Sequence, residues 1–279
     1  MPTRRFIQCD VFSPVPTQGN GLAVVVDADG LSDAAMQAFA AWTNLAETTF
    51  LLPPTDPGAD YRVRIFTPAH EMPFAGHPTL GSCAAWLRSG GVPRKAGRVV
   101  QQCEVGLIDV TYQAPGHFEF AAPPTAVRPM AEATREAIIR ALGIERNTIV
   151  RTAELDNGPV WQVFELASSD AVLAAPSSAV RWPGFRSIGL IGPRAEGSDC
   201  NDEVRMLAPS SGMSEDPITG SLNAAIAMWR LAEGRLTGPR TVSQGTAIGR
   251  RGRVTVRPDG ARVWIGGQVQ VLITGTVAL

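Results

Sequence analysis

Segments in which hydrophobic residues recur at every second position alternate with segments of helical period. Together they predict strands separated by a small number of helices. Alternating or β-rich segments predict strands at residues 4–12, 22–27 and 61–67. A Pro- and Gly-containing turn at 13–20 joins the first two as a hairpin. Ser32 can cap a helix that places Met36 and Phe39 toward a core and ends near Asn44.

The middle of the chain predicts a β-meander followed by a boundary. The meander strands cover residues 99–105, 107–112 and 117–121. The Pro-rich stretch 121–125 then separates a strand from a helix over 134–142. We therefore expect two domains, residues 1–124 and 125–279, with the C-terminal strand able to cross back to the first.

Two helical segments, residues 73–87 and 215–226, share a pattern of Pro, Gly and Ser at an offset of 139 residues. This offset places His77 on Asp216 and Gly81 on Gly220. Four other elements recur in the same order, and Arg186 takes the place of Glu47. The pattern predicts a duplicated α+β fold of two pseudo-symmetric domains, each a curved, mostly antiparallel sheet wrapped around one long buried helix.

Each repeated segment opens with Pro near the first helical turn, followed by Gly and Ser. Proline suits a helix start because its missing N–H would be unpaired there, and small residues let a ligand approach the electropositive amides. Each segment is therefore a candidate anion-binding site. The alternative is that both are simply capped core helices.

If the halves pack as mates, the two helix starts would face one cleft between the domains. We expect that site to contain Glu47, His77 and Asp216 with the backbone amides near Gly76, Gly81, Gly220 and Ser221. A carboxylate shielded from water suits proton abstraction from carbon, and helix amides suit a substrate carboxylate or enolate. For Glu47 the alternative is a surface residue at a helix end.

Charge and composition narrow the classes of partner. The 25 basic and 26 acidic residues give a net charge of −1, which argues against nucleic acid or an anionic membrane as a partner. No apolar run has the length of a membrane span, so we expect a soluble, cytoplasmic protein. Four cysteines without CxxC spacing and three histidines without ligand spacing predict neither a metal site nor a cofactor.

The chain resembles the phenazine-biosynthesis PhzF family of isomerases, within the diaminopimelate epimerase-like fold. The segments that carry the resemblance are QGNGLAVV at 18–25, NLAETTF at 44–50, FTP at 66–68, PFAGHPTLGS at 73–82, EDPITGS at 215–221, SQGTAIGR at 243–250, GGQV at 266–269 and GTV at 275–277. The resemblance implies a two-domain fold with the site between the halves and a homodimer. It also implies an isomerase that acts on a small-molecule carboxylate.

The resemblance implies a role for each matching residue. Glu47 would be the acid/base that moves a proton between carbons. His77 and Asp216 would bind and polarise the substrate, with Gly76, Gly220 and Ser221 near its carboxylate. Neither segment begins with a cysteine, so the two-thiol racemisation of the epimerase branch is not supported.

Two departures from the family pattern bear on the substrate. Ala46 stands where Ser is common before the glutamate, and Asn223 stands where a small residue or His is usual. Two other functions stay open for the same residues: a lyase or hydratase that uses Glu47, and a non-catalytic scaffold that binds a metabolite.

Overall fold

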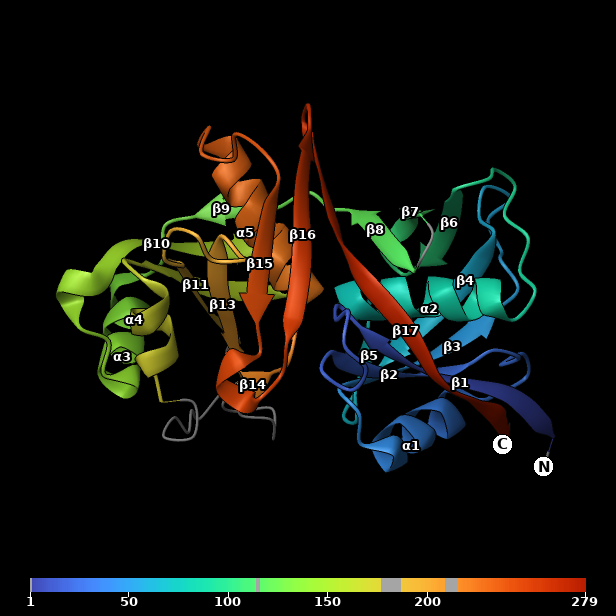
Figure 1. The fold of residues 1–279 in the computed structure, drawn as a ribbon. Coiled ribbons are helices and arrows are strands. Elements are labelled where there is room, and N and C mark those ends of the chain that lie inside the picture. The colour runs from blue at the N-terminus through green and yellow to red at the C-terminus, as the bar shows by residue number, and fades with distance from the viewer. Residues whose placement is uncertain (1, 114–115, 177–186, 209–214) are drawn as a thin grey trace. The chain divides into compact units, whose positions relative to one another are not determined.

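The computed structural model describes residues 2–113, 116–176, 187–208 and 215–279 (Figure 1). The chain divides into two compact units. Unit 1 contains residues 1–121 and 266–279, and unit 2 contains residues 122–265. The division falls at the start of the Pro-rich stretch, and the C-terminal segment completes unit 1.

Unit 1 contains two helices and a set of short strands. The helices are α1 (Asp33–Thr43) and α2 (Gly76–Arg88). The strands are β1 (Thr3–Val11), β2 (Asn20–Val25), β3 (Glu47–Leu52), β4 (Tyr61–Phe66), β5 (Glu71–Met72), β6 (Arg98–Cys103), β7 (Gly106–Gln113), β8 (His117–Ala121) and most of β17 (Arg262–Ala278). Strands β6, β7 and β8 form the predicted antiparallel meander.

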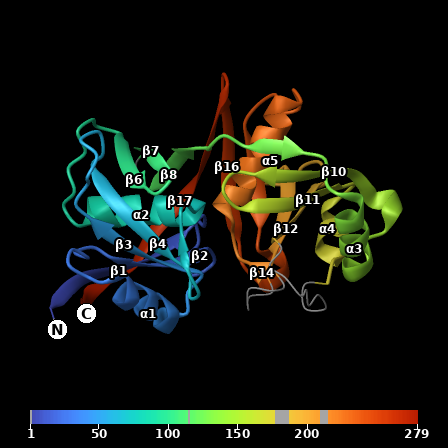
Figure 2. The ribbon, with the colours of Figure 1, turned by 180° about the vertical axis from the view of Figure 1, so that it is seen from behind.

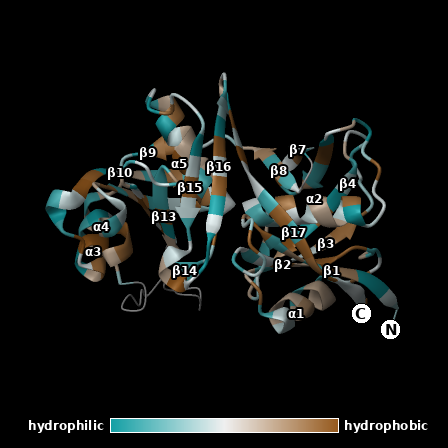
Figure 3. Cartoon of the chain, in the orientation of Figure 1, coloured by the Kyte–Doolittle hydropathy of each residue, from teal (hydrophilic) through white to brown (hydrophobic). Residues whose placement is uncertain are grey.

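The described residues of unit 2 form three α-helices and two 3₁₀ turns. The helices are α3 (Glu132–Leu142), α4 (Ser169–Ala174), α5 (Gly220–Ala232), η1 (Arg146–Thr148) and η2 (Thr246–Ile248). The strands are β9 (Ala126–Arg128), β10 (Ile149–Asp156), β11 (Val160–Leu166), β12 (Ser187–Pro193), β13 (Asp202–Leu207), β14 (Glu215–Asp216), β15 (Arg240–Gln244) and β16 (Gly252–Asp259). Strand β16 alternates between buried and half-buried positions, and its hydropathy alternates accordingly (Figure 3).

The strand pairings of unit 2 repeat those of unit 1 in order and direction. In unit 1, β1–β2 is antiparallel, β2–β3 parallel, β3–β4 and β4–β5 antiparallel, β4–β6 parallel and β6–β7 antiparallel. In unit 2, β10–β11, β11–β12, β12–β13, β13–β14, β13–β15 and β15–β16 follow the same sequence of directions. Each unit is therefore a mixed, mainly antiparallel sheet built to the same plan.

One long helix lies in the core of each unit. Helix α2 packs against β1, β2, β3 and β8 (Figure 2), and its first ten residues are all buried. Helix α5 is buried over a similar length. The ends of α1 match the predicted ones. The Ser32 side chain accepts a hydrogen bond from the Ala35 amide, and the helix ends at Asn44, which adopts the left-handed conformation.

The predicted offset of 139 residues between the helical segments is wrong. Glu71 pairs with Phe66 of β4, and Glu215 pairs with Leu207 of β13. Helix α2 begins at Gly76 and α5 begins at Gly220, so these elements are 144 residues apart. The sequence match through Pro, Gly and Ser therefore pairs residues that lie five positions away from their structural equivalents.

Ion pairs confirm the corrected register. Arg64 of β4 forms a two-pronged pair with Glu71, and Arg205 of β13 forms the same pair with Glu215. In this register, His77 corresponds to Ser221 rather than to Asp216.

The same pairings also change the equivalent of Glu47. Thr48 pairs with Phe66, and Ile188 pairs with Leu207, so Glu47 corresponds to Ser187. Arg186, which the sequence placed there, lies outside the described residues. Whether Glu47 is compared with Arg186 or with Ser187, the position in unit 1 is acidic and its counterpart in unit 2 is not.

None of the helices in the described residues is both long and apolar enough for a membrane crossing.

Candidate active site

Glu47 is the first residue of β3, beyond the Asn44 cap that ends α1. The parallel register places it beside Leu22 of β2. Its side chain is only 14% exposed. Glu47 is therefore a largely buried strand residue, and the alternative of a surface residue at a helix end is wrong.

His77 is the second residue of α2, and it lies against Glu47. Its side chain is 4% exposed, and its Nε2 atom lies 3.2 Å from Oε2 of Glu47. On the other side of the ring, Nδ1 lies 3.3 Å from the Asn20 side-chain nitrogen. His77 therefore contacts Glu47 through one ring nitrogen and Asn20 through the other.

The His77 imidazole is neutral at physiological pH. Burial lowers its pKa to about 3, and a hydrogen bond with the Gly21 backbone opposes that shift only in part. A neutral imidazole at 3.2 Å places no positive charge beside the Glu47 carboxylate. The contact restricts where the carboxylate can lie, and an ionised carboxylate can accept a proton from a bound molecule.

Asp216 lies in unit 2, on the short strand β14, where it pairs with Met206. It is 7% exposed. The Thr219 hydroxyl donates to its Oδ2 atom at 2.5 Å, and the Gln244 amide donates to its backbone carbonyl at 3.3 Å. These contacts fix both the carboxylate and the backbone that carries it.

Helices α2 and α5 both begin without a side-chain cap. Ala75 and Thr219 occupy the N-cap positions, and neither side chain bonds to a first-turn amide. The first amides of a helix have no intrahelical partner and carry a partial positive charge. The uncapped starts at Gly76 and at Gly220-Ser221 permit anion binding, which stays a prediction.

Gly81 lies one turn further into α2. A Cβ atom there would come within 2.5 Å of Leu22 and 3.0 Å of Val11. Close packing of the helix on β1 and β2 accounts for a glycine at this position. The substrate-binding role expected for Gly81 stays a prediction.

The structure brings Glu47 and His77 together within unit 1, and it groups Asp216 with Gly220 and Ser221 within unit 2. That all of these residues face one cleft stays a prediction.

Three supporting residues were not predicted as part of the site: Asn20, Thr219 and Gln244. Asn20 contacts the His77 ring, whereas Thr219 and Gln244 contact Asp216. All three lie within segments that carry the family resemblance, and that position was the one sequence feature that could have pointed to them. Their roles depend on strand pairing, which the sequence does not display.

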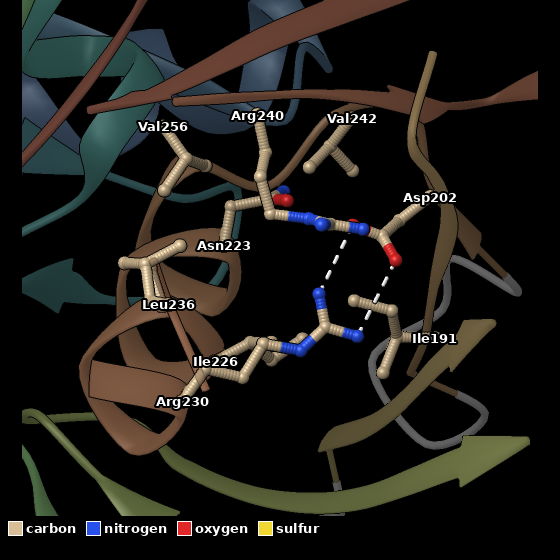
Figure 4. Close-up of a pocket in the computed structure, with 10 residues that line it drawn as sticks. Ile191, Asp202, Asn223, Ile226, Arg230, Leu236, Arg240, Val242 and Val256 are labelled. Carbon is tan, nitrogen blue, oxygen red and sulfur yellow. Dashed lines mark hydrogen bonds and ion pairs between the residues drawn. The ribbon is translucent and has the colours of Figure 1, made fainter. Parts of the chain in front are cut away.

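Two cavities lie away from the predicted residues. The first, about 10 Å³, lies in unit 2 between α5 and neighbouring strands, where Arg230 and Arg240 converge on Asp202 (Figure 4). It has room for about one water molecule. The second is a hollow of about 490 Å³ over β4 to β6, lined by Arg62 and Glu71 among others.

The thiols do not provide an alternative acid/base pair. Cys9, Cys83, Cys103 and Cys200 are free and buried. Burial raises the pKa of Cys9 to about 12 and raises that of Cys83 further, so both stay protonated. Within the described part of the chain, no cluster of three or more His, Cys, Asp or Glu side chains could hold a metal ion.

Comparison with known proteins gives matches along almost the whole chain. The family model PhzC-PhzF, described as phenazine biosynthesis-like protein, matches residues 9–278. Antisense-enhancing sequence 1 of Schizosaccharomyces pombe is 35% identical, and the match covers 99% of each chain. The trans-2,3-dihydro-3-hydroxyanthranilate isomerase of Pseudomonas fluorescens is 32% identical, with 98% of this chain and 99% of that protein covered.

Solved structures agree with the predicted fold class. A predicted epimerase from Pseudomonas aeruginosa has a TM-score of 0.82 at 27% identity, with 99% of each chain covered. Proline racemase and hydroxyproline epimerase structures share the fold alone, at 14% identity. The α+β, diaminopimelate epimerase-like fold class is confirmed.

Proposed function

Because this chain belongs to the PhzC-PhzF family of phenazine biosynthesis-like proteins and is an isomerase, we propose that Glu47 shifts a proton between two carbons of a small carboxylate-bearing metabolite. The observation that carries the proposal is the placement of Glu47 against His77, with 3.2 Å between Oε2 and Nε2. No cofactor is required for this reaction.

Proton transfer by one carboxylate balances without an oxidant or reductant. Glu47 removes a proton from a substrate carbon, so a C–H bond breaks and an O–H bond forms. The electron pair moves into the adjoining unsaturated system of the substrate. Glu47 then returns the proton to another carbon, which restores the carboxylate and leaves an isomer.

The other site residues bind and orient the substrate in this proposal. His77, which lies 3.2 Å from Glu47, binds and polarises the substrate. Asp216 binds and polarises the substrate, and the amides at Gly76, Gly220 and Ser221 receive its carboxylate. The homodimer and the cytoplasmic location implied earlier remain predictions.

The first substrate to test is trans-2,3-dihydro-3-hydroxyanthranilate, on which three of the similar proteins are named to act. It carries both a carboxylate and an unsaturated ring, as the proposed chemistry requires. Ala46 and Asn223 depart from the usual family pattern, so related cyclic and acyclic unsaturated carboxylates belong in the same panel.

The experiment is turnover of this panel followed by mass spectrometry of the products. The proposal predicts a product of unchanged mass. A product that differs by one water would show a lyase or hydratase and contradict the proposal. A metabolite that binds without turnover, with binding insensitive to Glu47→Gln, His77→Gln and Asp216→Asn, would favour a non-catalytic scaffold.

A further inference from the structure

Gln244, the last residue of β15, directs four side-chain hydrogen bonds toward the segment of residues 216–223. It is completely buried. Its Oε1 atom accepts the Thr219 backbone N–H at 3.1 Å and the Asn223 side-chain N–H at 2.9 Å. Its Nε2 atom donates to the Thr219 hydroxyl at 2.9 Å and to the Asp216 carbonyl at 3.3 Å.

The direction of these hydrogen bonds follows from the donor groups. An amide nitrogen can only donate, so the Thr219 hydroxyl accepts from Gln244. The hydroxyl hydrogen is then free to point at Oδ2 of Asp216, 2.5 Å away. A donor relay therefore runs from Gln244 through Thr219 to the Asp216 carboxylate.

Asn223 completes the relay from the first turns of α5. Its side-chain nitrogen donates to the Thr219 carbonyl and to Gln244 Oε1, both at 2.9 Å, and the residue is 3% exposed. These contacts explain its departure from the family pattern, because the amide supports Gln244. Because Asn223 donates to Gln244, the Gln244 atom on that side is the oxygen, and its nitrogen is left to donate to Thr219 and Asp216.

Unit 1 contains a similar support with a different end point. Gln101 of β6 donates to the Thr79 hydroxyl at 3.1 Å, and that hydroxyl donates to the Ala75 carbonyl at 2.9 Å. Tyr61 donates to Gln101 Oε1 at 2.7 Å. In the 144-residue register Thr79 corresponds to Asn223, whose side chain likewise donates to the carbonyl four residues earlier. Ala75 stands where Thr219 does and has no hydroxyl, so unit 2 adds a hydroxyl contact to a carboxylate that unit 1 lacks at this position.

We propose that Gln244 is a positioning residue for the isomerisation: through the Thr219 hydroxyl it holds the Asp216 carboxylate in one orientation toward the substrate. The inference rests on the proposed function, because it assumes that Asp216 acts on the substrate. It predicts that the hydroxyl, rather than the shape of residue 219, matters for turnover.

The test compares Thr219→Ser, which keeps the hydroxyl, with Thr219→Val, which keeps the shape and removes it. With whichever panel substrate the wild type isomerises, Thr219→Ser should retain kcat within about threefold. Thr219→Val should lower kcat by about 10- to 100-fold with little change in KM, since misplacing a group slows the chemical step. Gln244→Leu should give a similar loss, with circular dichroism checking that each variant is folded.

A double variant separates the relay from general damage. If Gln244 acts through Thr219, Thr219→Val combined with Gln244→Leu should be no slower than the more impaired single variant. Losses that multiply in the double variant would overturn the proposal. If Gln244→Leu does not fold, the Thr219 pair decides alone, and equal kcat for Thr219→Ser and Thr219→Val would overturn it.

Glu47→Gln distinguishes this inference from the proposed function. Retained turnover in Glu47→Gln contradicts the function itself. Turnover abolished in Glu47→Gln but equal in the two Thr219 variants contradicts the positioning role alone.

Discussion

A largely buried carboxylate and a buried neutral imidazole lie in contact in unit 1. Glu47 and His77 are both largely removed from water, and Asn20 contacts the ring from the side opposite Glu47. Asn20 and Glu47 hold the imidazole between them, and the imidazole in turn restricts where the carboxylate can lie. Such a carboxylate is held in one geometry, as a general base must be.

The buried His77 makes stability depend on pH. Its pKa is lowered to about 3, whereas the unfolded residue titrates near 6.5. Between these values the unfolded state binds more protons, so the free energy of unfolding falls as pH falls. The contribution of one such group is at most about 1.4 kcal/mol per pH unit.

Replacing His77 with Gln should therefore flatten the acid side of the stability profile. We expect the free energy of unfolding, measured by urea titration between pH 7 and pH 4, to fall less steeply than in the wild type. The exposed His70 provides the matched control, and His70→Gln should leave the slope unchanged. Equal slopes for the wild type and His77→Gln would show that His77 is not buried in its neutral form.

Sequence motifs singled out the candidate site residues more readily than the residues that support them. Glu47 and His77 stand in recognisable segments, and the structure places them in contact. Gln244 reaches Thr219 and Asp216 only because β15 pairs with β13 and brings residue 244 beside the start of α5. That pairing joins residues distant in sequence, and local patterns carry no record of it.

At the scale of elements, ion pairs mark the repeat more reliably than similar letters. Pro, Gly and Ser recur at many helix starts, so their match at an offset of 139 misaligned the two segments by five residues. Each β4-like strand carries an arginine that binds a glutamate on the following short strand. Ion pairs that recur between the same two strands identify equivalent positions, whereas Pro, Gly and Ser shared by chance do not.

The two equivalent ion pairs differ in burial and should differ in energetic weight. Arg205 and Glu215 are 2% and 0% exposed, whereas Arg64 and Glu71 are 17% and 34% exposed. Glu215→Gln leaves a buried guanidinium without its counter-charge and should cost about 3–5 kcal/mol. Glu71→Gln should cost about 1 kcal/mol or less, because Arg64 is partly solvated and retains Asp33.

Urea unfolding of both variants tests this difference, with Glu71→Gln as the matched control for Glu215→Gln. Equal losses of unfolding free energy would mean that burial does not set the strength of these pairs.

At the scale of the whole molecule, the fold class followed from the sequence but its details did not. Periodicity predicted the hairpin, the meander and the two buried helices, and the family resemblance predicted the α+β fold that solved relatives share. The strand β17 begins in unit 2 and pairs with β1 of unit 1 over residues 269–278. The return of the C-terminal strand to unit 1 depends on its pairing with the N-terminal strand β1, and local hydrophobic patterns do not specify that partner.

The central claim is that Glu47 carries the proton, and its most direct measurement is turnover in heavy water. Wild-type protein should convert its substrate to an isomer that contains deuterium at the newly protonated carbon, because a carboxyl proton exchanges with solvent. Glu47→Gln keeps the shape of the side chain but cannot accept the proton, so kcat and deuterium incorporation should both fall by about 10²- to 10⁴-fold. Turnover and deuterium incorporation that match the wild type would contradict the account.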